Sequence, residues 1–328
     1  MRFRLASRAL IAGIVATLAL GACGGSDTGT GTDAGGGGGL EKSKITIGAL
    51  PIPDSAALYI ADKRGFFQKE GLTVEIQAVQ GGAQAQQSLM GGSLDFTQSN
   101  YVSTFLAVAA GNRMKIIADL YQATPNSFNL MVSENSPIKS LTDLRGKKIA
   151  VNSLKNVGTL AVTSVLKTQG LSEKDVQFLE FPFPDMAGKL EQGAVDAAWM
   201  TEPHLTAAQK NIGARKLADT MAGSTADLPI AGVVATEAFT GKNPKTVAAF
   251  QRALAQGQQI AAADRKAVEE ILPTYTRIDA ATAAAITLGT FPTRLDESRL
   301  QRVADLMLDQ GYLKSRIEAK VVLPGTPG

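Results

Sequence analysis

Two kinds of hydrophobic pattern alternate along most of the chain. Residues 45–50 alternate as a half-buried β-strand does, and residues 56–69 carry apolar positions with helical periodicity after a helix-start signal at residues 51–55. Gly71 and Leu72 follow this helix, and residues 73–76 form the next strand. This strand, helix, strand order predicts mainly parallel sheets with right-handed crossovers.

The same order of elements recurs about 100 residues later. Residues 148–151 form a strand, residues 152–158 a loop, residues 159–168 a helix and residues 176–179 another strand. Gly92 and Gly193 each follow a helix, as a left-handed cap does, and they lie 101 residues apart, as do Asp95 and Asp196. The repeat predicts two α/β lobes of similar design, each a mainly parallel sheet flanked by helices, with a ligand cleft between them.

The chain is expected to pass twice between these lobes. Residues 128–132 and 229–235 have strand patterns, and we expect them to cross side by side as a hinge. The following segments are helical and are expected to pack on the first lobe: 243–263, 267–272, 279–287 and 296–309. Lobe 1 therefore comprises residues 44–127 and 233–328, and lobe 2 comprises residues 128–232.

The N-terminal segment has the pattern of a lipoprotein export signal. Three arginines precede an apolar run of about 12 residues, too short for the roughly 20 that span a bilayer, and the run ends at Leu20-Gly21-Ala22-Cys23. We expect residues 1–22 to be removed and Cys23 to be lipidated. Residues 23–43, rich in glycine, would then tether an exported protein to the outer face of the cell membrane, or to the periplasmic side in a two-membrane cell.

Composition restricts the chemistry. Residues 1–22 contain three arginines and no acid, so the remainder has 30 basic and 30 acidic residues, and no basic surface for nucleic acid is expected. Cys23 is the only cysteine and His204 the only histidine, which argues against a zinc site. Without a Gly-x-Ser-x-Gly motif, a hydrolase has little support. We expect no cofactor, no metal and no catalysis.

Candidate ligand contacts follow from the predicted topology. Ligands of such sheets bind beyond the carboxyl ends of the strands, and a solute that favours a closed form must touch both lobes. From the first half we select Asp54, Ser55, Gln98, Ser99 and Asn100. From the second half we select Asn152, Thr159, Trp199 and Glu202.

Some of these residues could instead have a purely structural role, and others are selected for a specific kind of ligand chemistry. Ser55 and Asn100 are equally suited to cap helices, and Trp199 to lie in a core. Thr159 begins a helix whose free N–H groups suit an anionic oxygen. Trp199 suits a ring or an alkyl chain, whereas Glu202 would attract an amine and repel an anion.

Four segments together resemble a known family, the solute-binding proteins of ABC importers in the nitrate, sulfonate and taurine class, which includes thiamine-precursor binders. They are residues 56–75 with Gly-Phe-Phe-Gln-Lys-Glu-Gly-Leu, residues 92–96, residues 141–151, and residues 193–203. The resemblance implies the two-lobe fold of type 2 periplasmic binding proteins. It also implies a small organic solute, a permease with a cytoplasmic ATPase as partners, and a monomer.

The solute stays open at this stage. The candidate loops contain one basic residue, Lys155, beside the acids Asp54, Asp185 and Glu202, whereas an anion binder would bring arginine or lysine to its pocket. The alternative is therefore a thiamine-precursor pyrimidine or another nitrogen-rich solute. A ligand-presenting sensor and a pyrimidine-forming enzyme are the remaining alternatives, although the enzyme would lack its cysteine.

Overall fold

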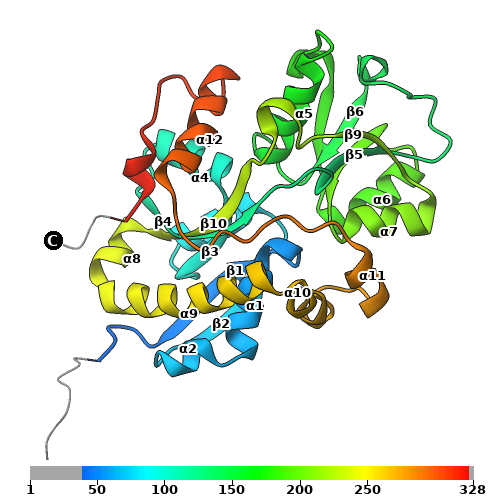
Figure 1. The fold of residues 1–328 in the computed structure, drawn as a ribbon. Coiled ribbons are helices and arrows are strands. Elements are labelled where there is room, and N and C mark those ends of the chain that lie inside the picture. The colour runs from blue at the N-terminus through cyan, green and yellow to red at the C-terminus, as the bar shows by residue number, and fades with distance from the viewer. Residues whose placement is uncertain (1–38, 325–328) are drawn as a thin grey trace, which may run out of the picture. The chain divides into compact units, whose positions relative to one another are not determined.

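The computed structural model of the chain describes residues 39–324. The expected signal peptide, the lipidation site Cys23 and most of the expected linker lie outside the described residues. None of the described helices is both long and apolar enough to cross a bilayer. Figure 1 shows two sheets with helices packed around them, the first mainly in blue, cyan and yellow and the second in green.

The first sheet has five strands and is mainly parallel. The order across the sheet is β2 (Thr73–Ala78), β1 (Lys44–Ala49), β3 (Phe96–Asn100), β10 (Pro229–Thr236) and β4 (Met114–Gln122). Strands β2, β1 and β3 pair in parallel, because each crossover passes through a helix, while β10 is antiparallel to both of its neighbours.

The second sheet has the same design. Its order is β7 (Gln177–Glu180), β6 (Lys148–Val151), β8 (Ala197–Thr201), β5 (Phe128–Val132) and β9 (Arg215–Asp219). Strand β5 is antiparallel to β8 and β9, as β10 is to its neighbours in the first sheet. The predicted fold of two mainly parallel sheets flanked by helices is therefore confirmed.

The two repeated aspartates make the same contacts in each half. The Asp95 carboxylate accepts the Thr46 N–H at 3.0 Å, and the Asp95 N–H donates to the Thr46 carbonyl at 2.9 Å. In the second half Asp196 and Lys148 make the matching pair, at 2.8 and 2.9 Å. Each aspartate thus ties the start of an inner strand to the first strand of its half, so the repeated aspartates are structural.

Twelve α-helices cover the sheets within the described residues. They are α1 (Ala56–Lys63), α2 (Phe66–Lys69), α3 (Gly82–Met90), α4 (Tyr101–Ala109), α5 (Val157–Lys167), α6 (Phe183–Glu191), α7 (His204–Ile212), α8 (Glu237–Lys242), α9 (Pro244–Ala263), α10 (Arg265–Ile271), α11 (Ala280–Ala285) and α12 (Glu297–Asp309). The helix expected over residues 56–69 is two helices, because Gly65 adopts a left-handed conformation with φ of 71° and ends the first.

The expected hinge of two paired strands is wrong. Strand β5 lies in the second sheet and β10 in the first, so they do not pair with each other. The chain changes sheet in the segments just before these strands, where the Ala123 N–H donates to the Leu228 carbonyl at 2.9 Å. The expected domain boundary between residues 232 and 233 falls inside β10, and we propose residues 123–127 and 220–228 as the connections between lobes.

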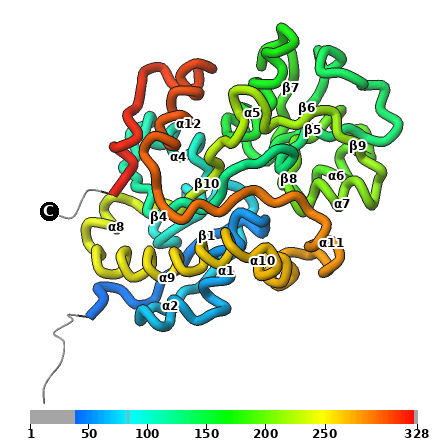
Figure 2. The backbone as a smooth tube through the Cα atoms, viewed as in Figure 1, coloured from blue at the N-terminus to red at the C-terminus, as the bar shows by residue number. Residues whose placement is uncertain are grey.

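The C-terminal segment adds a third connection. It runs from α11 back to α12 past the ends of both sheets, in orange in Figures 1 and 2. Gln122 and Thr290 exchange two backbone hydrogen bonds, at 3.0 and 2.9 Å. On the second lobe, the Lys210 Nζ donates to the Thr282 Oγ1 at 3.0 Å, and Gln310 of the tail donates to Ser164 of α5. The tail therefore contacts elements that flank both sheets.

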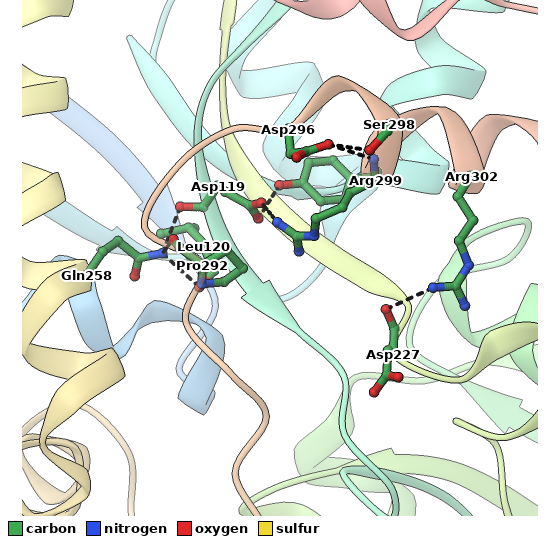
Figure 3. A network of polar contacts seen from close by, with 10 residues as sticks. Asp119, Leu120, Asp227, Gln258, Pro292, Asp296, Ser298, Arg299 and Arg302 are labelled. Atoms are coloured by element: carbon green, nitrogen blue, oxygen red, sulfur yellow. Dashed lines mark hydrogen bonds and ion pairs between the residues drawn. The ribbon is translucent and has the colours of Figure 1, made fainter.

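A buried ion pair anchors α12 to the first sheet. The Arg299 Nη1 lies 2.6 Å from the Asp119 Oδ2, and the Tyr101 hydroxyl donates to the Asp119 Oδ1 at 2.6 Å (Figure 3). On the other side of the same strand, the Gln258 side-chain amide donates to the carbonyls of Asp119, Leu120 and Pro292. These contacts fix the tail and α9 to strand β4.

Candidate functional site

A cavity lies where the ends of strands from both sheets meet. Its empty space, counted together with its open mouth, is about 420 Å³. The first half contributes polar residues after β1 and along β3, namely Asp54, Gln98, Ser99 and Asn100. The second half contributes Asn152 and the ring of Trp199. Six of the nine residues selected from the sequence therefore line one cavity, with contributions from both halves.

Three aromatic rings form one side of this cavity. Phe128 stacks on Trp199 with ring centroids 5.2 Å apart and planes 12° apart, and Phe183 tilts against Trp199 at 5.9 Å. The indole N–H of Trp199 donates to the Thr220 Oγ1 at 2.9 Å, so the ring is held in place. A Cβ on Gly158 would lie 2.6 Å from the indole, so a glycine at this position lets the helix approach the ring.

The remaining lining is aliphatic or glycine. It consists of Leu50, Ile52, Gly82, Val157, Ile230 and Ala231. These residues, with Phe128 and Phe183, were not selected from the sequence, although Val157 lies in the loop expected over residues 152–158. Sequence reasoning favoured polar side chains and therefore missed the apolar part of the site.

Asp54 is the only ionisable side chain in the lining. It is 2 % exposed, and its Oδ1 is buried without a hydrogen-bond partner. Burial raises the pKa of its carboxyl to about 7, and a hydrogen bond from its own backbone N–H opposes this shift only in part. A buried carboxyl oxygen without a partner at a cavity wall is costly to the protein, so Asp54 is a candidate contact for a ligand group.

Three of the selected residues lie outside the lining. The Ser55 hydroxyl is 2.7 Å from the Gln98 Oε1 and supports that side chain. The Thr159 side chain accepts the Asn156 N–H at 3.0 Å, and Asn156 in turn accepts the Gly158 N–H at 2.9 Å, so the start of α5 is already capped. The expected anion position at this helix is thus occupied by a side chain of the protein.

Glu202 has partners of its own. Its carboxylate accepts the Thr206 N–H at 3.1 Å, the Thr206 hydroxyl at 2.9 Å and the Thr287 N–H at 3.2 Å. Burial raises its pKa, and these hydrogen bonds oppose that shift. Glu202 therefore ties the end of β8 to the start of α7 and to the C-terminal tail.

No lysine or arginine is among the described residues that line the cavity. Lys155, the basic residue of the candidate loops, is exposed and does not line the cavity. His204 stacks on the outer side of the lining residue Phe183, with centroids 5.7 Å apart, and burial lowers its pKa to about 4, so the imidazole is neutral. Within residues 39–324, no three His, Cys, Asp or Glu side chains gather as a metal site would need.

The sequence matches the NMT1/THI5-like family over residues 52–267, which is about two thirds of the chain. The chain therefore belongs to this family. The matched region includes every strand of the two sheets except β1, and the lining residues Asp54, Gln98, Asn100, Asn152 and Trp199.

Two curated relatives differ in the solutes that their names give. The riboflavin-binding protein RibY of Chloroflexus aurantiacus is 27% identical over 66% of this chain and 62% of its own length. A putative aliphatic sulfonates-binding protein of Escherichia coli is 30% identical over 42% of this chain and 43% of its own length. The match thus covers less than two thirds of each relative.

Solved structures share the fold. The alkanesulfonate-binding protein SsuA of Xanthomonas axonopodis pv. citri aligns with a TM-score of 0.72, covering 87% of this chain and 99% of that protein, at 20% sequence identity. The arrangement of two mixed sheets flanked by helices is therefore that of periplasmic binding proteins.

Proposed function

We propose that the protein is the solute-binding component of an ABC importer and that it takes up a small, uncharged, nitrogen-rich ring compound. The observation that carries the proposal is the cavity between the two sheets, which is lined by three aromatic rings together with carboxyl and amide side chains. Flat rings stack on such surfaces, and the polar side chains fix their orientation.

An anionic solute finds no basic partner in this lining. Sulfonates and nitrate are bound well by arginine or lysine, or by free helix N-termini. None of the lining residues is basic, and the start of α5 is capped by Asn156. The starts of α3 and α6, at the lining residues Gly82 and Phe183, have no side-chain cap in the described part of the chain and are the positions left to an anion. Above a pH of about 7 the buried Asp54 also carries a negative charge, which would repel an anion. The name of the relative RibY is consistent with a ring compound.

Binding without covalent change is favoured over catalysis. Cys23 is the only cysteine, and a lipid on this residue would leave no thiol. His204 packs behind Phe183 as a neutral ring rather than entering the cavity. The groups that line the cavity can orient a solute but include no activated nucleophile.

The setting of this activity is proposed from the sequence. We propose that residues 1–22 are removed, that lipidated Cys23 anchors a monomer to the outer face of the membrane, and that the two lobes close on the solute and present it to a permease with its ATPase. Residues from both halves of the chain at one cavity support closure, because such a solute stabilises the closed form.

The proposal is tested on the Cys23→Ser variant, which cannot be lipidated, by titrating it with a panel of solutes. Riboflavin and 4-amino-5-hydroxymethyl-2-methylpyrimidine represent ring compounds, and taurine, butanesulfonate and nitrate represent anions. The readouts are the fluorescence of Trp199, the only tryptophan, and the melting temperature. A ligand at 100 times its Kd adds about 2.7 kcal/mol to the free energy of unfolding.

We expect a ring compound to change the fluorescence and raise the melting temperature, and the anions to do neither. Binding of an anion with a Kd below that of every ring compound would contradict the proposed solute class. Conversion of a bound ring compound to a product would contradict the binding role.

A further inference from the structure

The hydrogen bonds inside the protein decide which polar atoms the cavity offers. The Gln98 Oε1 accepts the Leu50 N–H at 2.8 Å and lies 2.7 Å from the Ser55 hydroxyl. A backbone N–H can only donate, so the atom facing it must be the oxygen of the amide. The NH₂ of Gln98 has no partner among the described residues and stays available to a solute.

The Asn100 side-chain amide is also oriented with its oxygen bonded inside the protein and its NH₂ toward the cavity. Its Oδ1 accepts the Ser103 N–H at 2.8 Å as the N-cap of α4, which again fixes the oxygen. The Nδ2 lies beside Gly82, where it would be 3.6 Å from a Cβ, and Gly82 is itself part of the cavity wall. Asn100 therefore also offers a donor.

Asn152 contributes a third donor from the opposite half. The Asn156 Oδ1 is fixed by the Gly158 N–H at 2.9 Å, so the Asn156 Nδ2 is the donor in its 2.8 Å contact with the Asn152 Oδ1. The oxygen of Asn152 is thus occupied, and its NH₂ has no partner within residues 39–324. The Gly158 N–H thus orients the Asn156 amide, and the Asn156 amide orients the Asn152 amide.

The remaining polar groups supply one acceptor. The Ser99 Oγ already receives hydrogen bonds from Gln86 and Thr104, each at 3.0 Å. The Asp54 carboxyl has a buried oxygen with no partner. The side chains of the cavity therefore present three amide donors and one carboxyl acceptor beside a wall of aromatic rings.

We infer that the solute is a ring with a cyclic imide edge, in which one N–H lies between two carbonyl groups, and that Asp54 receives this N–H while Asn100 and Asn152 donate to acceptor atoms of the ring. The inference rests on the proposed function, since it assigns the solute class of the same cavity. Uracil-like and flavin-like rings have such an edge.

This pattern discriminates among ring compounds. A ring with an exocyclic amine and no carbonyl could donate its NH₂ to Asp54 but would accept from the amides only through its ring nitrogens. Each buried amide left unpaired would cost about 1–3 kcal/mol. A sulfonate would match the donors but would leave Asp54 without a partner. The imide edge satisfies both kinds of group.

The sharpest test uses lumiflavin and 3-methyllumiflavin, which differ by a methyl group on the imide nitrogen. We expect the chain with Cys23→Ser to bind lumiflavin at least about tenfold more tightly than the methylated ring, which corresponds to about 1.4 kcal/mol. In the Asp54→Leu variant, which has no acceptor, we expect this preference to fall below about threefold. The variant Asp185→Asn removes an exposed carboxylate outside the lining and serves as the matched control.

Two isosteric variants test the donors without disturbing the fold. Asn100→Asp keeps the oxygen that caps α4, and Asn152→Asp keeps the oxygen that accepts from Asn156, but each replaces an NH₂ by a carboxylate oxygen. We expect each to weaken lumiflavin binding at least about tenfold, with a melting temperature close to that of the parent chain. The structure thus predicts a loss of affinity without unfolding.

The outcomes separate this inference from the proposed function. Equal affinity for lumiflavin and its methyl derivative, or unchanged binding in both donor variants, overturns the imide assignment. Binding of 4-amino-5-hydroxymethyl-2-methylpyrimidine or adenine without binding of lumiflavin also overturns it, while a ring-binding function stands. If no ring compound binds, the proposed function falls with it.

Discussion

Asp54 is buried, and its Oδ1 has no hydrogen-bond partner among the described residues, so its ionisation gives a pH dependence. Its pKa is about 7 in the folded chain and near 3.8 when the carboxyl is free in water, so the folded state holds the proton more strongly. The contribution of Asp54 to stability is therefore most favourable below pH 4, declines as the pH rises to about 7, and is constant above that. The buried phenols of Tyr121 and Tyr275 interact with this charge, and both have pKa values raised by burial, so they stay neutral.

Asp54→Asn is expected to raise the melting temperature at pH 8 by at least about 2 °C, because it removes an unpaired buried charge. At pH 4 the gain should vanish, since the native carboxyl is then protonated. Thermal unfolding of both chains at pH 4, 6 and 8 measures the difference. A gain that is the same at every pH would mean that the Asp54 carboxyl is hydrated and has an ordinary pKa.

Ionisation of Asp54 should lower the stability of the protein but raise its affinity for a solute that donates an N–H. A carboxylate accepts a hydrogen bond better than a protonated carboxyl, so lumiflavin should bind more weakly at pH 5 than at pH 8, by about tenfold. Asp54→Asn should remove most of this dependence. Calorimetric titrations at the two pH values provide the comparison, and stronger binding at pH 5 would assign Asp54 the role of a donor instead.

At the scale of elements, the start of α5 and the ring of Trp199 fit because position 158 has no side chain. Gly158→Ala should lower the melting temperature by several degrees and weaken binding of the solute, although alanine favours helices by about 1 kcal/mol over glycine. The added Cβ would lie 2.6 Å from Trp199 Cε3, which is closer than packing allows, so the indole must move from the cavity wall.

Gly188→Ala is the matched control for this change. Gly188 lies inside α6, where a Cβ would meet nothing within 4 Å. This variant should be more stable than the parent by roughly 0.5–1 kcal/mol and should bind normally. If both alanine variants behave alike in urea unfolding and in solute binding, the close packing of Gly158 on Trp199 has no energetic consequence.

The elements that could be predicted from the sequence are those with local signals. Alternating strands, glycine caps and the repeat with Asp95 and Asp196 gave the two mainly parallel sheets, because these patterns are read within a few residues. Six cavity residues followed, since the carboxyl ends of parallel strands converge. Ser55, Thr159 and Glu202 lie outside the lining, and their side chains form hydrogen bonds within the protein. These partners can come from distant segments, as Thr287 does for Glu202, so they could not be read from the local sequence.

At the scale of the whole molecule, strand pairing between distant segments also escaped prediction. Residues 128–132 and 229–235 were both recognised as strands, but nothing in their own sequence decides which sheet each one joins. The third connection, through Gln122 and Thr290, pairs residues that are far apart along the chain. Such contacts are set by the packing of the whole tail, in which the Arg299–Asp119 pair is the most buried ionic contact with α12.

Arg299→Met tests how strongly this pair secures the tail. The Asp119 carboxylate is 1 % exposed, and without Arg299 its remaining side-chain donor would be the Tyr101 hydroxyl. Breaking a buried ion pair from one side leaves an uncompensated charge, so we expect unfolding to become easier by about 2 kcal/mol or more. Arg302, one turn further along α12, donates to backbone carbonyls from an exposed position (Figure 3), and Arg302→Met should cost less than about 1 kcal/mol.

The double variant Arg299→Met with Asp119→Asn separates two contributions to the lost stability: the loss of the ion pair itself, and the cost of leaving the Asp119 carboxylate buried without Arg299. The neutral amide can still accept from Tyr101, so we expect the double variant to recover at least half of the stability that Arg299→Met loses, as measured by urea unfolding. The C-terminal tail also contacts the second lobe, through Gln310 with Ser164 and through Thr282 with Lys210. We therefore expect the single variant, in which α12 is loosened, to bind the solute more weakly, and the double variant to regain affinity. A single variant with parental stability and affinity would show that α12 is held by its apolar face alone, and that the tail does not couple the two lobes.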